Sequence, residues 1–344
     1  MKRNILFFIM MFAAGLPSPV YAYQLALGDL HSHTSFSDGK GIPDEAYDMA
    51  RNQAGLQFWS VTDHEEQIGV VTTDPPGAKR KEWDVMRQSA RDKTANGKFV
   101  GLAGFEWGMD EIQGHINVLH TDAVPKRAEL LNLNKFYRWV YKHPEAVFGF
   151  NHPSDHPGVF KKMEYVPQVA SQAFYIAVNV DEDLQYYYMA LDNGWRIGPS
   201  AQQDNHSKNW GLHENGNLTG AYINEISSDG LLDAFENRRI YATNDKNLKV
   251  WLDADGQPMG SALAADDAVT LHFNVTHDSG ALIASVRIIT NTGSVAQEWQ
   301  PNQAAFTSEY KAAADAAGVR WFVVLARDAN GRRVVSAPIW VKKE

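Results

Sequence analysis

Short apolar runs recur along the first two thirds of the chain, and most of them adjoin a residue that can bind a metal or transfer a proton. The runs and their polar neighbours are 25–30 before His31, 58–61 before Asp63, 99–105 before Glu106, 116–119 after His115, 147–150 before His152, 174–180 before Asp181 and 195–197 leading into Asp204. Apolar runs of this length are typical of buried strands. Polar residues at strand ends indicate a functional edge of the sheet.

Segments with helical signals lie between several of these runs. The clearest is 43–53, where Pro43 suits a first helical position, Asp44 and Glu45 occupy the first turn, and Gly55 follows the end. Residues 79–95 form a second candidate helix. Strands that alternate with helices predict a parallel α/β layout, with the chemistry at the carboxyl ends of the strands, as in a β/α barrel. Seven or so strands fit the runs better than a regular eight.

The pattern changes beyond Asn244. Val269, Leu271, Phe273 and Val275 alternate with polar residues, and Asp-Gly, Ser-Gly and Asn-Gly pairs separate the runs. This alternation of apolar and polar residues between turns predicts an antiparallel β-sandwich. We therefore divide the chain into a barrel over 23–246 and a sandwich over 247–344.

The first 22 residues have the pattern of a cleaved secretory signal. Lys2 and Arg3 precede an apolar run from 5 to 16, and small residues end the segment at Ala22. Pro17 and Pro19 end the run too early for a membrane span. We expect a mature protein that is periplasmic or secreted and does not bind a membrane.

Composition narrows the classes of function. The formal net charge of −9 disfavours a basic surface for nucleic acid and leaves a small-molecule substrate as the expected partner. The chain contains no cysteine, which excludes thiolate nucleophiles, cysteine-ligated zinc and iron–sulfur clusters. The sequence does not indicate an oligomeric state.

Histidines and carboxylates at the ends of the runs form a candidate metal-binding set. His31 and His33 are two residues apart, so in an extended segment both imidazoles face the same side. The full candidate set is His31, His33, Asp38, His64, Glu106, His115, His152, Asp204 and His206. A catalytic metal takes roughly three or four protein ligands, so this set suits two or three divalent ions. Imidazole with carboxylate suits zinc, iron(II) or manganese.

In their order along the chain, these motifs resemble the polymerase and histidinol phosphatase (PHP) superfamily of metallohydrolases. The motifs are GDLHSHT with SDG, TDH, the isolated Glu106, GHINVL, NHP and DNH, and they cover about residues 25–245. The resemblance implies a distorted seven-stranded β/α barrel with a trinuclear centre, whose ligands carry over onto the nine residues above. Many members have His where Asp38 stands, so Asp38 either binds a metal less firmly or orients an imidazole. The GFEW motif and the β-rich tail are similar to the carbaryl-hydrolase-like (CehA/McbA) branch.

Three further residues are candidates for the reaction itself. Asp63 can hold an imidazole, transfer protons as a catalytic residue, or bind a metal, and a carboxylate beside a metal-binding histidine most often holds the imidazole. Lys208 follows His206 at an even spacing and is a candidate for substrate binding, as is Arg196. The other histidines are interpreted as structural residues.

The most direct interpretation is a metal-dependent hydrolase that uses a metal-activated hydroxide. Small phosphomonoesters or diesters are the first substrate class, because the resemblance points to them and clustered cations stabilise a phosphoryl group. A carboxyl ester, carbamate or amide is the alternative, since few basic residues lie near the motifs. A non-catalytic metal-binding or adhesion protein is a remote alternative, because nine ligand-type residues at one edge are hard to explain without chemistry.

Overall fold

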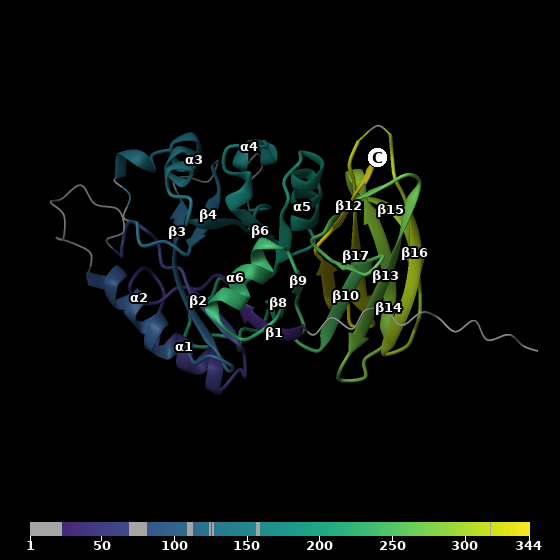
Figure 1. The fold of residues 1–344 in the computed structure, drawn as a ribbon. Coiled ribbons are helices and arrows are strands. Elements are labelled where there is room, and N and C mark those ends of the chain that lie inside the picture. Colours follow the sequence, from purple (N-terminus) through teal and green to yellow (C-terminus); the bar gives the residue numbers. More distant parts are fainter. Residues whose placement is uncertain are drawn as a thin grey trace, which may run out of the picture.

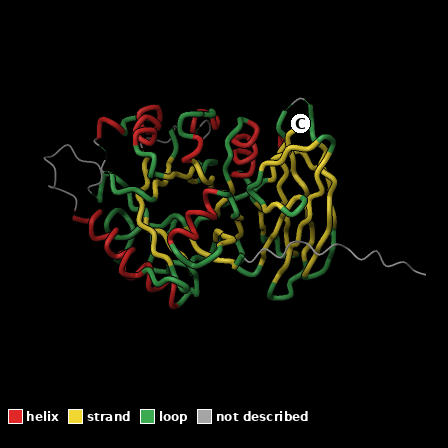
Figure 2. The backbone as a smooth tube through the Cα atoms, in the orientation of Figure 1, coloured by secondary structure: helices red, strands yellow, loops and turns green. Residues whose placement is uncertain are grey.

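The computed structural model describes residues 23–68, 81–108, 113–123, 125, 127–155, 159–316 and 318–344. The fold is mixed α/β, with helices gathered on the N-terminal half and strands filling the C-terminal half (Figure 1; Figure 2). The helices of the described part are α1 (Pro43–Asn52), α2 (Lys81–Lys93), α3 (Leu133–Lys142), α4 (Phe160–Met163), α5 (Asp183–Asp192) and α6 (Ser228–Glu236), with 3-10 turns η1 (Arg127–Glu129), η2 (Ala170–Gln172) and η3 (Asn291–Gly293).

One sheet of 15 strands contains strands from both halves of the chain, and a separate sheet of four antiparallel strands packs in the C-terminal half. The strands of the N-terminal half are β1 (Gln24–Asp29), β2 (Phe58–Val61), β3 (Val100–Gly108), β4 (His115–Leu119), β5 (Val147–Asn151), β6 (Ala173–Ala177), β7 (Gly198–Ser200), β8 (Leu218–Ile223) and β9 (Ile240–Thr243). The strands of the C-terminal half are β10 (Leu248–Ala254), β11 (Gln257–Pro258), β12 (Ala262–Ala265), β13 (Ala268–His277), β14 (Ile283–Thr290), β15 (Ser294–Trp299), β16 (Ala305–Ala313), β17 (Arg320–Asp328), β18 (Arg333–Ser336) and β19 (Ile339–Lys343).

The strand directions of the N-terminal half bring six strand ends to one edge. β1, β2 and β3 pair in parallel, and so do β5, β6 and β7. β4 is antiparallel to both β3 and β5, and β8 is antiparallel to β1. The expected parallel layout is therefore interrupted, because β4 follows β3 without a helical crossover. Since β4 runs in the opposite direction, its first residue reaches the same edge as the last residues of its neighbours.

The two ends of this strand order lie against each other. Thr219 of β8 exchanges hydrogen bonds with Ala201, donating to its carbonyl at 3.1 Å and accepting from its amide at 3.2 Å. Gly198 of β7 packs directly on Ile240 of β9, where an added Cβ would lie 2.6 Å from the isoleucine side chain. Close approach of β7 and β9 therefore requires a residue without a side chain at this point.

α1 and α6 show how the helices are positioned. α1 begins at Pro43 as the sequence predicts, and the Glu45 carboxylate accepts a hydrogen bond from the amide of Ile42 at 3.1 Å. α2 is observed over Lys81–Lys93, and the first residues of the predicted helix over 79–95 lie outside the described residues. α6 packs Leu231 and Phe235 among the starting ends of the parallel strands, with the Phe235 ring 6.0 Å from that of Phe58. α6 thus covers the end opposite to the edge that carries the polar motifs.

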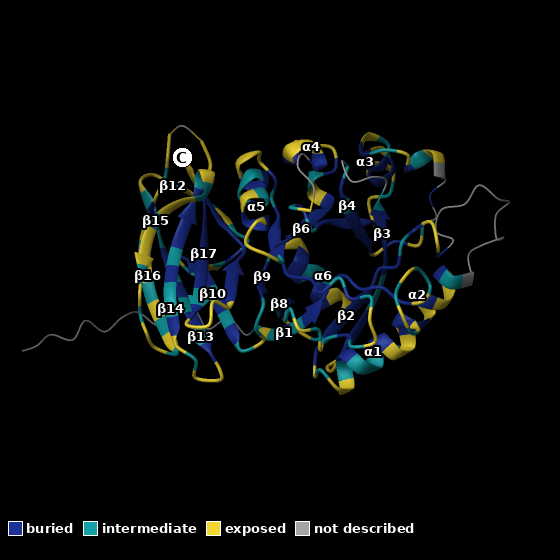
Figure 3. Ribbon diagram, turned by 180° about the vertical axis from the view of Figure 1, so that it is seen from behind, coloured by how far each residue is buried: buried dark blue, intermediate teal, exposed yellow. Residues whose placement is uncertain are grey.

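The C-terminal half buries its core between two sheets. In β13 the buried positions alternate strictly, and they include Val269, Leu271, Phe273 and Val275, as the sequence pattern predicts. These side chains pack with residues of β14, β17 and β18 in one apolar cluster. Figure 3 shows this buried interior in both halves of the molecule.

The two halves share a sheet across the predicted boundary at 246/247. β18 pairs with β9, with Val334 opposite Thr243, so the large sheet runs continuously from one half into the other. Arg327 and Arg333 of the C-terminal half form ion pairs with Asp181, which follows β6. In the described part of the chain, no helix is long and apolar enough to cross a membrane.

Candidate metal centre

The structure brings all nine predicted ligand residues into one cluster at the carboxyl edge of the strands. Eight of them belong to at least one of three groups in which the candidate ligand atoms lie within 4.8 Å of one another. The groups are His33, Asp38, His64 and His206; His31, Glu106 and His152; and His31, His33 and Asp204. The ninth residue, His115, lies at the same edge, because it opens the reversed strand β4 and lies beside Glu106.

Each residue reaches the cluster because of where its strand ends. His31 and His33 follow β1, and His64 follows β2 after Asp63. His152 directly follows β5 and has a φ of 24°, and Asp204 follows β7 with a φ of 48°. Residues other than glycine rarely adopt positive φ, and such conformations concentrate at functional sites.

The carboxylate of Glu106 lies at the centre of the cluster. Its Oε1 is 3.2 Å from His31 Nε2, 3.3 Å from His115 Nδ1 and 3.4 Å from His152 Nε2. Asn151 also donates a hydrogen bond to this oxygen at 2.9 Å. One oxygen of a single buried carboxylate therefore faces three imidazoles.

The second oxygen of Glu106 faces two further histidines. Oε2 lies 3.2 Å from His64 Nδ1 and 3.4 Å from His33 Nε2. The Glu106 side chain is only 2% exposed. The two oxygens thus point at different sets of imidazoles, which is the geometry of a carboxylate able to bridge two cations.

Asp204 and Asp38 complete the cluster on either side of His33. Asp204 Oδ1 is 3.1 Å from His31 Nε2 and 3.2 Å from His33 Nε2. Asp38 Oδ1 is 3.3 Å from His206 Nε2, and its Oδ2 is 3.5 Å from Nε2 of His64. Asp38 therefore takes part in the cluster itself and does not merely lie beside it.

Charge in the cluster is set by two carboxylates, that of Glu106, which is buried, and that of Asp204, whose side chain is 37% exposed. Burial alone would raise the pKa of Glu106, but His31, His115 and His152 hold it well below its usual value. Burial likewise opposes ionisation of Asp204, yet His31 and His33 keep the pKa of Asp204 well below the ordinary range. Burial would lower the pKa of His31, but Glu106 and Asp204 raise it well above its usual value. The two carboxylates therefore draw positive charge into the cluster, whether from protonated imidazoles or from metal cations.

The donor set fits divalent metal ions. Two ligand atoms that each lie about 2.1 Å from one ion are separated by roughly 3.0 to 3.4 Å, close to the separations given above. His33 Nε2 and Asp204 Oδ1 are buried and lie 3.2 Å apart, but neither has a hydrogen-bond partner in the protein with suitable geometry. Unpaired buried polar atoms are costly, so atoms of this kind at one point favour a cation between them.

A second layer of residues holds the imidazoles, and sequence reasoning identified it only in part. His31 Nδ1 lies 2.8 Å from the Thr62 hydroxyl. His152 Nδ1 lies 2.8 Å from Asp155, which raises the pKa of His152 to about 10 together with Glu106 and against the effect of burial. Asp155 was missed, although a carboxylate three residues after a ligand-type histidine is a usable signal. Asn151 belongs to the NHP motif and donates a hydrogen bond to Glu106, but the sequence analysis assigned it no role.

Asp63 does not contact the cluster through its carboxylate. Oδ1 accepts hydrogen bonds from the Thr34 amide at 2.7 Å and the Ser37 hydroxyl at 2.5 Å, and Oδ2 accepts from the Thr34 hydroxyl at 2.6 Å. Ser37 in turn lies 3.3 Å from His33 Nδ1. Of the roles weighed for Asp63, this geometry favours holding the loop that carries His33 and Asp38.

The two predicted substrate-binding residues are placed differently from expectation. The Lys208 amine forms an exposed ion pair with Glu45 of α1 at 2.8 Å. Arg196 is not brought to the cluster, because it precedes β7 whereas the cluster lies beyond the end of β7. Its guanidinium lies over the ring of Trp340, 4.6 Å from the centroid, at the junction of the two halves.

Comparison with known proteins gives distant matches. No family model matches the chain. An uncharacterised protein of Chlamydia trachomatis is 23% identical over 92% of this chain, and one of Chlamydia pneumoniae is 22% identical over 93%. The chain spans 57% and 58% of the length of these two relatives.

One solved structure has the same two-part architecture. It is a two-domain protein of Bacteroides vulgatus, described as containing a predicted PHP-like metal-dependent phosphoesterase. The match has a TM-score of 0.51 and 19% sequence identity, and it covers 88% of this chain and 91% of the other. The likeness establishes a shared fold.

Proposed function

We propose that this protein is a PHP-type metal-dependent hydrolase that acts on small phosphomonoesters or diesters and holds two or three divalent ions. The observation that carries the proposal is Glu106, whose two oxygens face His31, His115 and His152 on one side and His33 and His64 on the other. The likeness to the Bacteroides vulgatus protein supports the same reaction class.

The nine clustered residues would hold the ions, and Glu106 lies at the centre of this cluster. Bound zinc, iron or manganese would supply Lewis-acid polarisation of the scissile bond and an acidified water nucleophile. The protein contributes fixed ligand positions: Thr62 orients the His31 ring, Asp155 orients the His152 ring, and Ser37 links Asp63 to His33. Such outer contacts fix the tautomer and direction of each imidazole.

Lys208 is the candidate for contact with an anionic substrate. Its amine forms an exposed ion pair with Glu45, and exposed pairs of this kind are weak. A hydrogen bond from a charged amine to a phosphoryl oxygen is stronger. We therefore expect an anionic substrate to compete with Glu45 for the Lys208 amine.

Hydrolysis of a carboxyl ester, carbamate or amide is the second candidate. It is favoured by the scarcity of basic groups, because Lys208 is paired with Glu45 and Arg196 lies on Trp340. Phosphate recognition usually recruits such groups. This candidate also agrees with the resemblance to the carbaryl-hydrolase-like branch.

The same proposal covers the two domains and the location of the protein. Strands β1 to β9 within 23–246 would form the distorted PHP-type barrel, and 247–344 would form a sandwich that shares a sheet with it through β18 and β9. Residues 1–22, interpreted as an export signal, lie outside the described residues. We place the mature enzyme in the periplasm or outside the cell on that pattern alone.

The test compares substrates that share one leaving group. Purified protein is analysed for metals and then assayed with para-nitrophenyl phosphate, bis-para-nitrophenyl phosphate and para-nitrophenyl acetate. The phosphoesterase proposal expects metal-dependent release from a phosphate ester at a kcat/KM well above that for the acetate. Preference for the acetate would select the second candidate, and a protein that binds no metal would reject both.

A further inference from the structure

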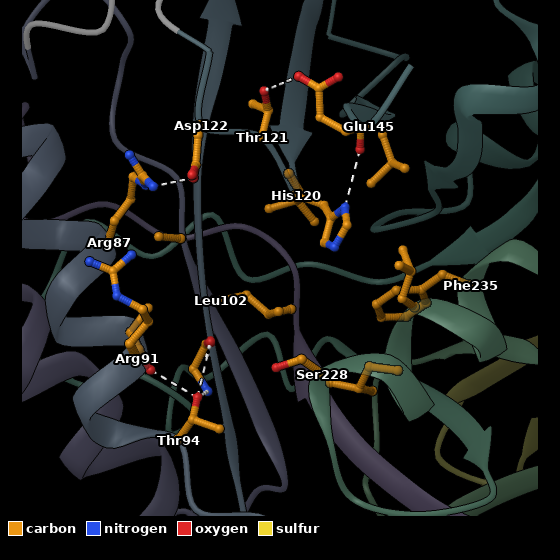
Figure 4. A pocket seen from close by; sticks show the side chains of 17 residues that line it. Arg87, Arg91, Thr94, Leu102, His120, Thr121, Asp122, Glu145, Ser228 and Phe235 are labelled. Atoms are coloured by element: carbon orange, nitrogen blue, oxygen red, sulfur yellow. Dashed lines mark hydrogen bonds and ion pairs between the residues drawn. The ribbon is translucent and has the colours of Figure 1, made fainter. Parts of the chain in front are cut away.

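A cavity of about 740 Å³ lies at the end of the strands opposite to the metal centre (Figure 4). It is bounded by α2, α6, the first residues of β3 and the loop after β4, and none of the nine clustered residues lines it. Its apolar wall consists of Leu102, Leu119, Val147, Leu231, Leu232 and Phe235. Pockets that bind small molecules have volumes of about 300 to 1,000 Å³ and mainly apolar walls of this kind.

The cavity exists because small residues line the contact between α2 and β3. An added Cβ on Gly101 would lie 2.7 Å from the carbonyl oxygen of Ala90, so the helix backbone rests directly on the strand. Ala90 and Ala103 also line the cavity, and neither has a side chain long enough to fill it. An apolar volume left without side chains reduces packing stability, so an occupant with an apolar body would restore contacts.

The charges around the cavity leave one arginine without a carboxylate. Arg87 is paired with Asp122. Arg91 donates to the amide oxygen of Gln88 at 2.8 Å and has no carboxylate within ion-pair distance among the described residues. Arg91 is exposed and can pair with an anionic group that binds in the cavity.

Arg91 and the start of α6 border the cavity from different helices. Figure 4 shows Arg91 and Thr94 at the left, at the end of α2, and Ser228 across Leu102 on the side of α6. The amide of Gly97, after α2, donates to the carbonyl of Ile226, before α6, at 2.8 Å, and so ties the two segments together. Because the first turn of α6 carries Asp229, the positive charge available at the cavity comes from Arg91 rather than from this helix end.

His120 supplies a polar group on the opposite side. Its Nδ1 lies 3.2 Å from the carbonyl oxygen of Glu145, to which it donates, and a neutral ring then has Nε2 as an acceptor. Its backbone has a φ of 56°, which holds the ring in this position at some cost in strain. The cavity thus has an apolar wall, a cationic side and one additional polar contact.

We propose that this cavity binds a small amphipathic anion, with an aromatic or short alkyl body on the apolar wall and a carboxylate or sulfonate group at Arg91. The site is independent of the metal centre and of the hydrolase proposal.

The test uses anilinonaphthalene sulfonate, an aromatic anion that fluoresces in apolar surroundings, with the full-length protein. We expect saturable binding of one equivalent, competition by decanoate, and weaker binding of the uncharged analogue N-phenylnaphthylamine. Leu232→Trp, which places a ring in the cavity, should abolish binding. Arg91→Met should weaken it by about tenfold at low salt, the loss of one charge-assisted contact. Arg138→Met removes a comparably exposed arginine from α3 and should leave binding unchanged.

Circular dichroism and metal content establish that each variant is folded, and Ala103→Leu replaces Leu232→Trp if that variant does not fold. Equal probe affinity in wild type and a folded cavity-filling variant would overturn the site. Binding that is lost in the cavity-filling variant but unaffected by Arg91→Met, or equal for the uncharged probe, would overturn the anionic class of ligand.

Discussion

Nε2 of His31 lies 3.2 Å from Oε1 of Glu106, and both side chains are almost completely buried. They come from different strands, β1 and β3, whose carboxyl ends share an edge through β2. Because a buried carboxylate must be neutralised, this contact defines the electrostatic centre of the site.

Replacing Glu106 by Gln should reduce activity by at least about 100-fold and lower metal content, while the protein remains folded. The amide keeps the shape of the side chain but removes the charge that faces five imidazoles. Loss of residues that only support metal ligands already costs about 10- to 100-fold. Elemental analysis and kcat measure the two effects, and full activity with normal metal content would exclude Glu106 from the centre.

Removing the metal with a chelator should lower the melting temperature. A ligand present at 100 times its Kd stabilises the folded state by about 2.7 kcal/mol, which corresponds to a shift of very roughly 5 to 10 °C in a domain of this size. Differential scanning calorimetry with and without added zinc or manganese measures the shift. Glu106→Gln is the matched control, and a shift of equal size in that variant would place the bound metal elsewhere.

Lys208→Met should reduce kcat/KM for the best phosphate ester by about tenfold to a hundredfold, with unchanged metal content. The rate of hydrolysis of a neutral ester should change little, because such an ester has no negative charge for the Lys208 amine to contact. Glu45→Gln frees the Lys208 amine from its exposed partner and should not reduce phosphate hydrolysis. Wild-type phosphatase activity in Lys208→Met would make Lys208 a surface residue only.

Asp181→Asn should destabilise the protein in a pH-dependent manner. Partial burial raises the pKa of Asp181, but hydrogen bonds from Arg327 and Arg333 lower it below the ordinary value of 3.8. A lowered pKa in the folded state adds stability above the unfolded pKa, and this stability is lost as the pH falls through the folded pKa. The difference in free energy of unfolding between wild type and variant should therefore be constant from about pH 5 to 7 and shrink below about pH 4. Asp84→Asn, an exposed change on α2, is the control; a difference unaffected by pH would show that the ion pairs contribute nothing.

Lys162→Gly should stabilise the protein by about 0.5 to 1 kcal/mol. Lys162 has a φ of 55° and an exposed side chain, and glycine adopts this left-handed conformation without steric strain. Urea denaturation measures the gain. Arg138→Gly, in the right-handed helix α3, should instead cost about 1 kcal/mol, so equal effects of the two changes would remove the conformational explanation.

The order of the polar motifs indicated which residues lie together at one edge of the sheet, and β4 shows why. His115 opens its apolar run, whereas Glu106 and His152 follow or end theirs. Since β4 runs against β3 and β5, a residue at its start reaches the edge that its neighbours reach at their ends. The position of a polar residue relative to its run is thus a local signal of strand direction.

The sequence by itself determined the features that depend on neighbours along the chain. These are the alternation of Val269 to Val275 in β13, the start of α1 at Pro43, and the set of residues that face the candidate metal centre. Periodicity, helix starts and strand-end motifs depend on neighbouring residues, so they can be recognised in the sequence before the fold is known. Only the tertiary structure decided the pairing of β18 with β9, the placement of Arg196 on Trp340, the partner of Lys208 and the cavity beside α6. Each of these joins segments far apart in the chain, and such contacts depend on how the whole sheet twists and closes rather than on any period in the sequence.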